Sequence, residues 1–293
     1  MTGWTDRVWW SRDGLRLHYR DYAGPADKPP IICIPGLTRN ARDFAHVADR
    51  LTGRWRVICV ELRGRGESAY AHDPLSYVPL TYMQDIEALL AELGLARAVF
   101  FGTSLGGIVT MLLAAVHRDA IAGALINDVG PVLEEGGLGH IRSYVGRAQN
   151  HPSWLHAARS LQASQGANYP RYGLEDWLAF AKRLFKLSPS GRIVLDYDMR
   201  IAEPFRVQGA SAGVDLWPGW QALAGRPVTL LHGELSGLFS AETAREMVRR
   251  APEAELVTVG QVGHAPVLDE PEAVAAIDRL LARIEEQARA DGL

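Results

Sequence analysis

The stretch Phe100-Phe101-Gly102-Thr103-Ser104-Leu105-Gly106-Gly107 decides the fold of this chain. An apolar run, Ala98 to Phe101, leads directly into it, and a helical pattern over Ile108 to His117 follows. A Gly-x-Ser-x-Gly motif between a strand and a helix predicts a nucleophile elbow, a sharp turn that presents Ser104. Flanking glycines remove the Cβ atoms that would collide as the strand and the helix close on each other. The alternative is an ordinary tight turn between a strand and a helix.

Composition sets the broad class of the protein. The chain has 293 residues, 47% of them hydrophobic, which is enough for one large α/β domain or two ordinary ones with a sizeable core. The net charge is −3 with both signs interspersed, so no nucleic-acid partner is expected. No apolar run approaches the length of a bilayer span, and residues 1–6 lack the features of a signal peptide. We therefore expect a cytoplasmic protein that does not associate with a membrane.

The two cysteines, Cys33 and Cys59, each lie within an apolar, strand-like run. A disulfide would be unusual in the cytosol, and neither residue has the histidine or cysteine neighbours of a metal site. We expect both to be buried small apolar residues, and we expect no metal site.

Short apolar runs alternate with helical patterns along most of the chain, which indicates a largely parallel sheet. The chain begins with a predicted β-hairpin whose turn is Asp13-Gly14, a dipeptide that tolerates positive φ. The runs that follow read as buried strands: Ile31 to Ile34, Arg56 to Val60, Ala98 to Phe101, Gly123 to Asn127, Pro227 to Leu231 and Glu255 to Val259.

Three motifs in order carry a resemblance to a known family. Pro35-Gly36-Leu37 follows one strand, Glu61-Leu-Arg-Gly-Arg-Gly-Glu-Ser68 follows the next, and the Ser104 elbow follows a third. This order resembles the α/β-hydrolase fold superfamily, in its small esterase, lactonase and carbon-carbon hydrolase branch. The resemblance implies a mostly parallel eight-stranded sheet flanked by helices, with a helical cap between strands six and seven. Residues 1–130 and 221–293 would form the core domain and residues 131–220 the cap.

The predicted cap contains helical patterns over 140–150, 154–165 and 174–187. It also carries four tryptophans: Trp154, Trp177, Trp217 and Trp220. Each of them taken alone is explained by packing within the cap, but as a group they predict a largely apolar pocket under it.

A serine hydroxyl needs a base to accept its proton before it can attack a carbonyl. His264 follows the last strand, where it would reach the same edge of the sheet as Ser104, and serine before histidine is the order that this fold uses. The surrounding Gly-His-Ala-Pro also resembles the histidine loop of the family. We expect His264 to be the base.

The carboxylate that would orient this histidine has three candidate arrangements, because the loop after the seventh strand, where the family usually places an aspartate, has none. Asp128, after the sixth strand, is our first choice, since relatives are known with an acid there. Glu234 is the second choice because it lies in the usual loop. A Ser104/His264 dyad supported by Ser236 or water is the third. The simplest alternative for Asp128 is a residue that caps its own loop.

Two backbone N–H groups are expected to form an oxyanion hole for the developing negative charge. Leu105 directly follows the nucleophile and would supply the first. Leu37 matches the second donor of the family, although Pro35 stands where many relatives have histidine.

These residues support three hypotheses about function. The first is a serine hydrolase that cleaves a carboxylic ester, lactone or related acyl bond of a small, largely apolar substrate through an acyl-serine. The second is a cofactor-free dioxygenase or carbon-carbon bond hydrolase on aromatic-derived substrates, in which His264 acts as the base. The third is a catalytically impaired ligand-binding protein on a hydrolase scaffold. None of them requires a cofactor, and the sequence leaves open whether the chain forms a homo-oligomer.

Overall fold

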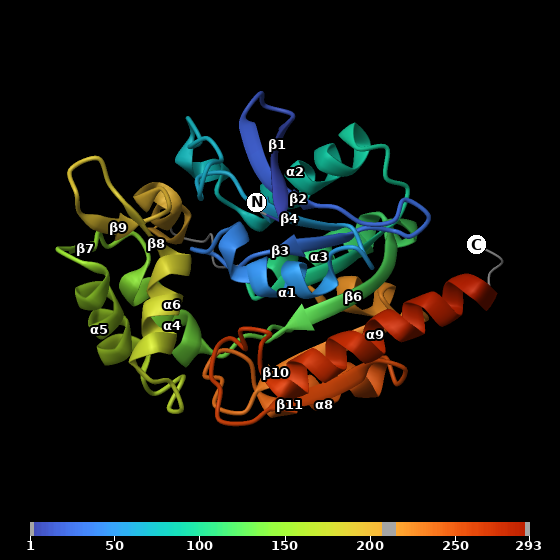
Figure 1. Ribbon diagram of the computed structural model, residues 1–293. Coiled ribbons are helices and arrows are strands. Elements are labelled where there is room, and N and C mark those ends of the chain that lie inside the picture. The colour runs from blue at the N-terminus through green and yellow to red at the C-terminus, as the bar shows by residue number, and fades with distance from the viewer. Residues whose placement is uncertain (1–2, 207–214, 291–293) are drawn as a thin grey trace.

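The computed structural model describes residues 3–206 and 215–290. Its centre is an eight-stranded sheet in which β1 and β2 are antiparallel and the remaining strands run parallel to one another (Figure 1). In order across the sheet the strands are β1 (Trp4–Trp10), β2 (Arg16–Tyr22), β4 (Val57–Glu61), β3 (Ile31–Ile34), β5 (Ala98–Thr103), β6 (Ile121–Asn127), β10 (Val228–Gly233) and β11 (Glu255–Val259). The predicted mostly parallel eight-stranded sheet is confirmed.

Helices cover both faces of this sheet and explain why its central strands are continuous apolar runs. Helices α1 and α9 lie on one face, and α2 and α3 lie on the other (Figure 1). Every residue of β3, β4 and β6 is buried, as expected for strands covered on two sides. The core helices are α1 (Ala45–Leu51), α2 (Pro79–Glu92), α3 (Leu105–Val116), α7 (Trp217–Ala222), α8 (Ala241–Arg250) and α9 (Pro271–Ala290), and the 3-10 helices are η1 (Ala41–Phe44), η2 (Pro74–Ser76) and η3 (Arg118–Ala120).

The N-terminal hairpin is present, but its connection is longer than predicted. The last cross-strand pair joins Trp10 to Arg16, so residues 11–15 form the loop instead of a two-residue turn. Gly14 adopts the expected left-handed conformation, with φ 76°. The Ser11 hydroxyl oxygen accepts a hydrogen bond from the Leu15 N–H, and this contact stabilises the wider loop.

Cys33 and Cys59 are free thiols, buried and directly opposite each other on β3 and β4. Burial raises the pKa of the Cys33 thiol well above its ordinary value. Both cysteines pack as small apolar residues, as predicted.

The elements from α4 to η4, residues 135–206, form a separate layer over one end of the sheet and are called the inserted segment below (Figure 1). They are α4 (Glu135–Tyr144), β7 (Asn150–His151), α5 (Trp154–Gln165), α6 (Leu174–Leu184), β8 (Phe185–Leu187), β9 (Ile193–Leu195) and η4 (Met199–Arg206). Part of the predicted cap, residues 207–214, lies outside the described residues.

Two of the predicted helices in this segment have the wrong bounds. The first starts at Glu135 and ends at Tyr144, because Gly146 takes a left-handed conformation (φ 76°) and turns the chain away. The helix predicted over 174–187 ends at Leu184, since the next residues pair with β9. Strands β7, β9 and β8 form a small antiparallel sheet that the sequence reasoning missed.

The helix α7 spans the expected domain boundary at residue 220 and packs against α3 of the core. Trp220 is buried there and donates a hydrogen bond from Nε1 to the Met247 carbonyl oxygen of α8 (2.8 Å). Among the described residues, no helix has both the length and the apolar character needed to cross a membrane.

Candidate active site

Ser104 lies at a sharp turn between β5 and α3, as the motif predicted. Its backbone has φ 52° and ψ −114°, which is a strained conformation for a residue with a side chain. A Cβ on Gly102 would lie 2.5 Å from the carbonyl carbon of Gly106, and a Cβ on Gly106 would collide with the carbonyl oxygen of Ile34. Only glycines fit at these two positions, and their close packing holds Ser104 at the tip of the turn.

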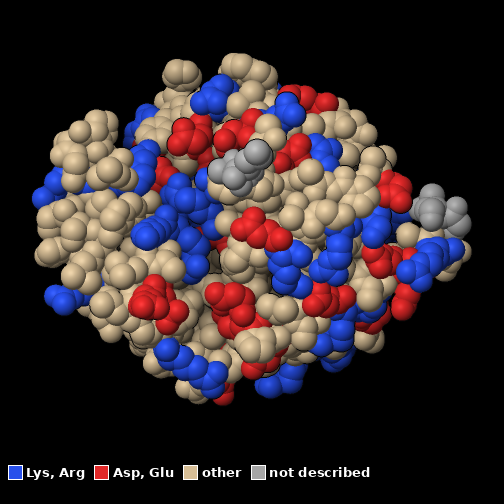
Figure 2. Space-filling view, viewed as in Figure 1, with Lys and Arg blue, Asp and Glu red and all other residues tan. Residues whose placement is uncertain are grey.

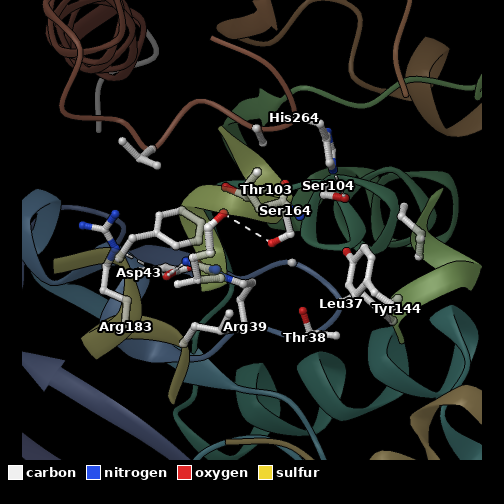
Figure 3. A pocket seen from close by; sticks show the side chains of 18 of the residues that line it. Leu37, Thr38, Arg39, Asp43, Thr103, Ser104, Tyr144, Ser164, Arg183 and His264 are labelled. Carbon is white, nitrogen blue, oxygen red and sulfur yellow. Dashed lines mark hydrogen bonds and ion pairs between the residues drawn. The ribbon is translucent and has the colours of Figure 1, made fainter. Parts of the chain in front are cut away.

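His264 comes from the loop after β11 and contacts Ser104 directly. Its Nε2 lies 2.9 Å from Ser104 Oγ, and Figure 3 shows the imidazole pointing at the serine. Two hydrogen bonds fix the loop: Asn127 Nδ2 donates to the Pro266 carbonyl (2.8 Å), and the Gly263 N–H donates to the Asn168 carbonyl of the inserted segment (2.7 Å). The histidine loop is therefore tied to the sheet edge and to the segment above it.

Asp128 holds the other side of the same imidazole. Its Oδ2 lies 2.7 Å from His264 Nδ1 and also accepts a hydrogen bond from Ser236 Oγ (2.7 Å). Its Oδ1 accepts from the Gly233 N–H (2.8 Å), and the residue is fully buried with φ 55°. A buried carboxylate with three hydrogen-bonding partners has a fixed orientation.

Glu234, the second candidate for the acid, does not contact His264. Its carboxylate accepts hydrogen bonds from the N–H and Nε2 of Gln261, at 2.7 and 3.3 Å, on the exposed side of the loop. The structure therefore brings Ser104, His264 and Asp128 into one hydrogen-bonded chain and leaves Glu234 outside it. Ser236, which occupies the usual acid loop, contacts Asp128 and not the histidine.

The two expected oxyanion donors, Leu37 and Leu105, both border the site of Ser104, one through the cavity and the other as its neighbour in the chain. Leu105 follows Ser104 as the first residue of α3, and Leu37 lines the cavity beside it. Within residues 3–206 and 215–290, neither backbone N–H has a hydrogen-bond acceptor. The Leu37 carbonyl is held from behind by Arg65, whose Nε donates to it at 2.9 Å. Both N–H groups are thus available to a bound group.

Ser104 opens into a cavity of about 520 Å³ between the sheet edge and the inserted segment. The prediction of an apolar pocket lined by tryptophans is wrong in its placement of those residues. Trp177 packs within an aromatic cluster of the inserted segment with Tyr169, Tyr172 and Phe180, and Trp220 lies in the core. Within the described part of the chain, none of the four tryptophans lines this cavity. Tryptophan is large enough to be used for packing in both layers, so its number alone does not predict a pocket wall.

The cavity wall contains both apolar and polar residues, including arginines, whereas the sequence predicted a largely apolar wall. Its apolar members include Phe44, Leu161, Phe180, Leu184 and Leu195. Its polar members include Arg39, Asp43, Tyr144, Arg147, Gln149, Ser164, Gln165, Tyr169, Arg183 and Tyr197. Burial raises the pKa of Tyr144 to about 12, further above neutral pH than the ordinary value of a tyrosine, so its hydroxyl is a hydrogen-bond donor.

Two arginines with structural consequences for the site were missed at the sequence level. Arg65 is fully buried, and its contact with Leu37 could have been suspected from an arginine placed between two glycines at a strand end. Arg183 lines the cavity from the last turn of α6, where a basic residue is ordinary and gives no signal of its own.

Comparisons with known proteins agree with this architecture. The sequence matches the model of the alpha/beta hydrolase family over residues 31–277. A 3-hydroxybutyrate-oligomer hydrolase from Cupriavidus necator is 34% identical over 267 residues, which cover 89% of this chain and 90% of that protein. A 2-(acetamidomethylene)succinate hydrolase from Mesorhizobium japonicum is 26% identical, with coverage of 80% and 81%.

A solved structure is similar over almost the whole chain. The crystal structure of an alpha/beta hydrolase from Novosphingobium aromaticivorans has a TM-score of 0.93 and 56% sequence identity, and it covers 97% of this chain and 99% of that one. The fold, the matched relatives and the elbow together make this protein an enzyme of the hydrolase class. The chain belongs to the alpha/beta hydrolase family.

Proposed function

We propose that this protein is a serine-dependent carboxylic ester hydrolase with Ser104 as nucleophile, His264 as general base and Asp128 as the acid that orients the histidine. The single observation that supports it most is the continuous chain of hydrogen bonds from Ser104 Oγ through both ring nitrogens of His264 to Asp128. This is the contact pattern that an activated serine requires.

In the first step Ser104 Oγ attacks the ester carbonyl carbon as its proton passes to His264 Nε2. The carbonyl oxygen becomes negative and accepts hydrogen bonds from the N–H groups of Leu37 and Leu105. Asp128 stabilises the imidazolium by accepting the hydrogen bond from Nδ1. When the bond to the leaving alcohol breaks, His264 returns the proton to the alcohol oxygen, and an acyl-serine remains.

In the second step a water molecule takes the place of the alcohol. His264 accepts one proton of the water, the oxygen of the water attacks the acyl carbon, and the same two N–H groups stabilise the second oxyanion. The Ser104–acyl bond breaks, His264 returns the proton to Ser104 Oγ, and the carboxylic acid leaves. The balance requires only ester and water, so the proposal involves no cofactor or metal.

We further propose that the segment predicted as residues 131–220 acts as a cap over a core made of residues 1–130 and 221–293, except that its last residues, which begin α7, pack with the core. Residues of α4, α5 and α6 line the same cavity as Ser104, which supports this division. A cap of this kind would exclude bulk water while the ester is bound and would set the shape of the substrate.

The substrates to test first are small linear esters. The relative at 34% identity is named for hydrolysis of 3-hydroxybutyrate oligomers, which are esters of a short hydroxy acid. A cavity of about 520 Å³ suits a molecule of that size. Lactones and thioesters of similar size are the next class.

Labelling with a fluorophosphonate tests the proposal directly. We expect the intact mass of the wild-type protein to rise by one adduct, and the Ser104→Ala variant to remain unlabelled and to lose 4-nitrophenyl acetate turnover by about 10⁴-fold or more. Ser164→Ala is the matched control, because this other serine of the cavity wall hydrogen-bonds the Ser160 carbonyl (3.0 Å) and not His264. Labelling that survives in Ser104→Ala would refute the assignment.

The dioxygenase alternative makes a different prediction for the same variants. In that reaction His264 removes a proton from an aromatic hydroxyl, and no acyl-serine forms. Oxygen uptake with hydroxylated heteroaromatic substrates that persists in Ser104→Ala, together with an absence of labelling in the wild type, would favour it over ester hydrolysis.

A further inference from the structure

The cavity that contains Ser104 carries more positive than negative charge. Three arginines, Arg39, Arg147 and Arg183, line it, and Asp43 is the one carboxylate of the described residues that does so. Figure 2 shows Lys and Arg side chains gathered beside a hollow where the inserted segment meets the core. An excess of guanidinium groups in a concave site favours an anionic ligand.

Arg39 and Asp43 neutralise each other and form a fixed part of this wall. The Arg39 Nε and Nη2 donate to the two oxygens of Asp43 at 2.6 and 2.7 Å, in a bidentate pair. The Arg39 guanidinium also lies 4.4 Å from the centre of the Phe180 ring. This pair leaves Arg39 with little capacity to bind a further carboxylate strongly.

Arg183 is the second arginine at this end of the cavity, and it has no carboxylate within hydrogen-bond distance among the described residues. Its one ion pair among the described residues is a 3.9 Å contact with Asp43, which is too long for a hydrogen bond and involves a carboxylate already used by Arg39. Its guanidinium lies 5.4 Å from the Phe180 ring centre, and its side chain is only 17% exposed. The ring and the low exposure hold the group in place. Tyr172 is a further side-chain partner, on the side of a second hollow that Arg183 also lines, and no carboxylate among the described residues lies within hydrogen-bond distance of the Arg183 guanidinium.

Other cations at the same junction are already paired, which separates them from Arg183. Arg42 and Lys186 both bind Asp196, at 2.7 and 2.9 Å. Arg147, on the inserted segment, differs from them, because it lines the cavity, is exposed and has no ion pair within residues 3–206 and 215–290. It can add a second, weaker positive charge.

Figure 3 shows where this charge lies relative to the chemistry. Arg183, Arg39 and Asp43 are on one side of the pocket, and Ser104 and His264 are on the other. A ligand that reaches both sides must therefore carry its negative group at a distance from the bond that is cut.

We propose that the substrate of this enzyme is an ester with a free carboxylate, which Arg183 binds at the side of the cavity opposite Ser104 and Arg147 supports. The planar guanidinium fork matches the two oxygens of a carboxylate, and partial burial strengthens the contact. This inference rests on the proposed ester hydrolase function. It adds the requirement that the charged end and the scissile ester belong to one molecule.

Two matched substrate pairs test the proposal. Mono-4-nitrophenyl glutarate and 4-nitrophenyl methyl glutarate differ only in a free carboxylate on the acyl side, and 4-acetoxybenzoate and its methyl ester differ in the same way on the alcohol side. In at least one pair we expect Arg183→Gln to lower kcat/KM of the charged member by about 10- to 100-fold, mainly through KM. The neutral member should change less than about threefold.

Lys182→Gln is the control, because it removes the same charge from the neighbouring residue of α6, which is exposed and does not line the cavity. Arg147→Gln is a second test at an exposed position, and there we expect a smaller loss of about three- to tenfold on the charged substrate. Thermal unfolding of each variant verifies that it is folded.

The outcomes separate the two proposals. If the wild type hydrolyses 4-nitrophenyl acetate and is labelled by fluorophosphonate, but Arg183→Gln affects the charged and neutral members of both pairs equally, carboxylate recognition is refuted and ester hydrolysis stands. If the wild type cleaves none of the esters and is not labelled, the proposed function fails and the carboxylate inference fails with it.

Discussion

The carboxyl edge of the sheet and the inserted segment both line the cavity, but they are built in different ways. At the sheet edge the backbone holds the key residues: Ser104 and Asp128 both have positive φ, and tightly packed glycines surround the serine. In the inserted segment, long side chains from α4, α5 and α6 form the wall. The backbone conformation fixes the first region, whereas side chains projecting from helices make up the lining of the second.

This difference suggests a division of labour. Under the proposed mechanism, residues at the sheet edge set whether any ester is cleaved, because they would contact the reacting atoms of every substrate. Residues of the inserted segment would set which ester is preferred, because they contact only the distant parts of the substrate. Substitutions at the sheet edge should therefore lower the turnover of every ester, whereas substitutions in the inserted segment should change which ester is preferred.

The largest effect is expected at Asp128. In Asp128→Asn the amide oxygen can still accept from the Gly233 N–H, which turns the amide nitrogen toward His264 Nδ1 and favours the wrong tautomer of the ring. We expect kcat/KM for 4-nitrophenyl acetate to fall by about 10⁴-fold. Glu234→Gln is the control and should change it less than about threefold, since among the described residues the Glu234 carboxylate hydrogen-bonds only Gln261. A larger loss in Glu234→Gln than in Asp128→Asn would contradict the assignment of the acid.

A pair of glycine-to-alanine substitutions compares how well the two regions accept an added Cβ atom. A Cβ at Gly106 in α3 would lie 2.7 Å from the carbonyl carbon of Ile34, so Gly106→Ala should lower the free energy of unfolding by about 3 kcal/mol or more. Gly139 in α4 has nothing within 4 Å of such a Cβ. There the change to alanine should stabilise the protein by up to about 1 kcal/mol through helix propensity. Urea unfolding measures both, and equal destabilisation would show that the regions do not differ in rigidity.

The smallest effect, on the free energy of unfolding, is expected at His18, a titratable residue near the sheet edge. His18 lies between Glu61 (2.9 Å) and Asp6 (3.0 Å), and Glu61 also accepts a hydrogen bond from the Ala41 N–H just after the Leu37 loop. Burial lowers the pKa of His18, but the two carboxylates outweigh burial, so the pKa of His18 lies above its ordinary value. The protonated histidine therefore stabilises the fold at pH below about 6.5, and this stabilisation is lost as the pH rises through the raised pKa.

His18→Gln should therefore cost about 1–3 kcal/mol of unfolding free energy at pH 6 and clearly less at pH 9. His156→Gln on α5 of the inserted segment is the control, because His156 is exposed and contacts only Ser153 among the described residues. Urea unfolding of the three proteins across this pH range measures the effect. A cost that does not change with pH would show that His18 supports the edge by packing alone.

Much of the sheet edge could be predicted from the sequence because its motifs are local. The elbow requires glycines within two residues of Ser104, and the buried strands are short apolar runs of the type that parallel sheets use. The acid could not be assigned in the same way. Asp128 and Glu234 both follow strands that are neighbours in the sheet, β6 and β10, so sequence position places either of them near His264. The direction of each side chain depends on the loops around it.

The inserted segment was less predictable for a different reason. Its helices are short, and their ends depend on turns such as the one at Gly146 and on the pairing of β8 with β9. Trp177 packs in the interior of this segment and Trp220 packs in the core, and neither lines the cavity. Arg183, the residue that we propose binds the substrate carboxylate, has an ordinary position in an amphipathic helix.

The sequence by itself determined the parallel sheet, the elbow at Ser104 and the strand-end position of His264, because these depend on local backbone chemistry and on a hydrophobic pattern that repeats along the chain. Only the tertiary structure decided that Asp128 contacts His264 while Glu234 turns toward Gln261, and that Arg183 lines the cavity without a close carboxylate partner in the part of the chain that the structure describes. These contacts join residues far apart in the chain, and they are set by side-chain directions that depend on packing across several elements.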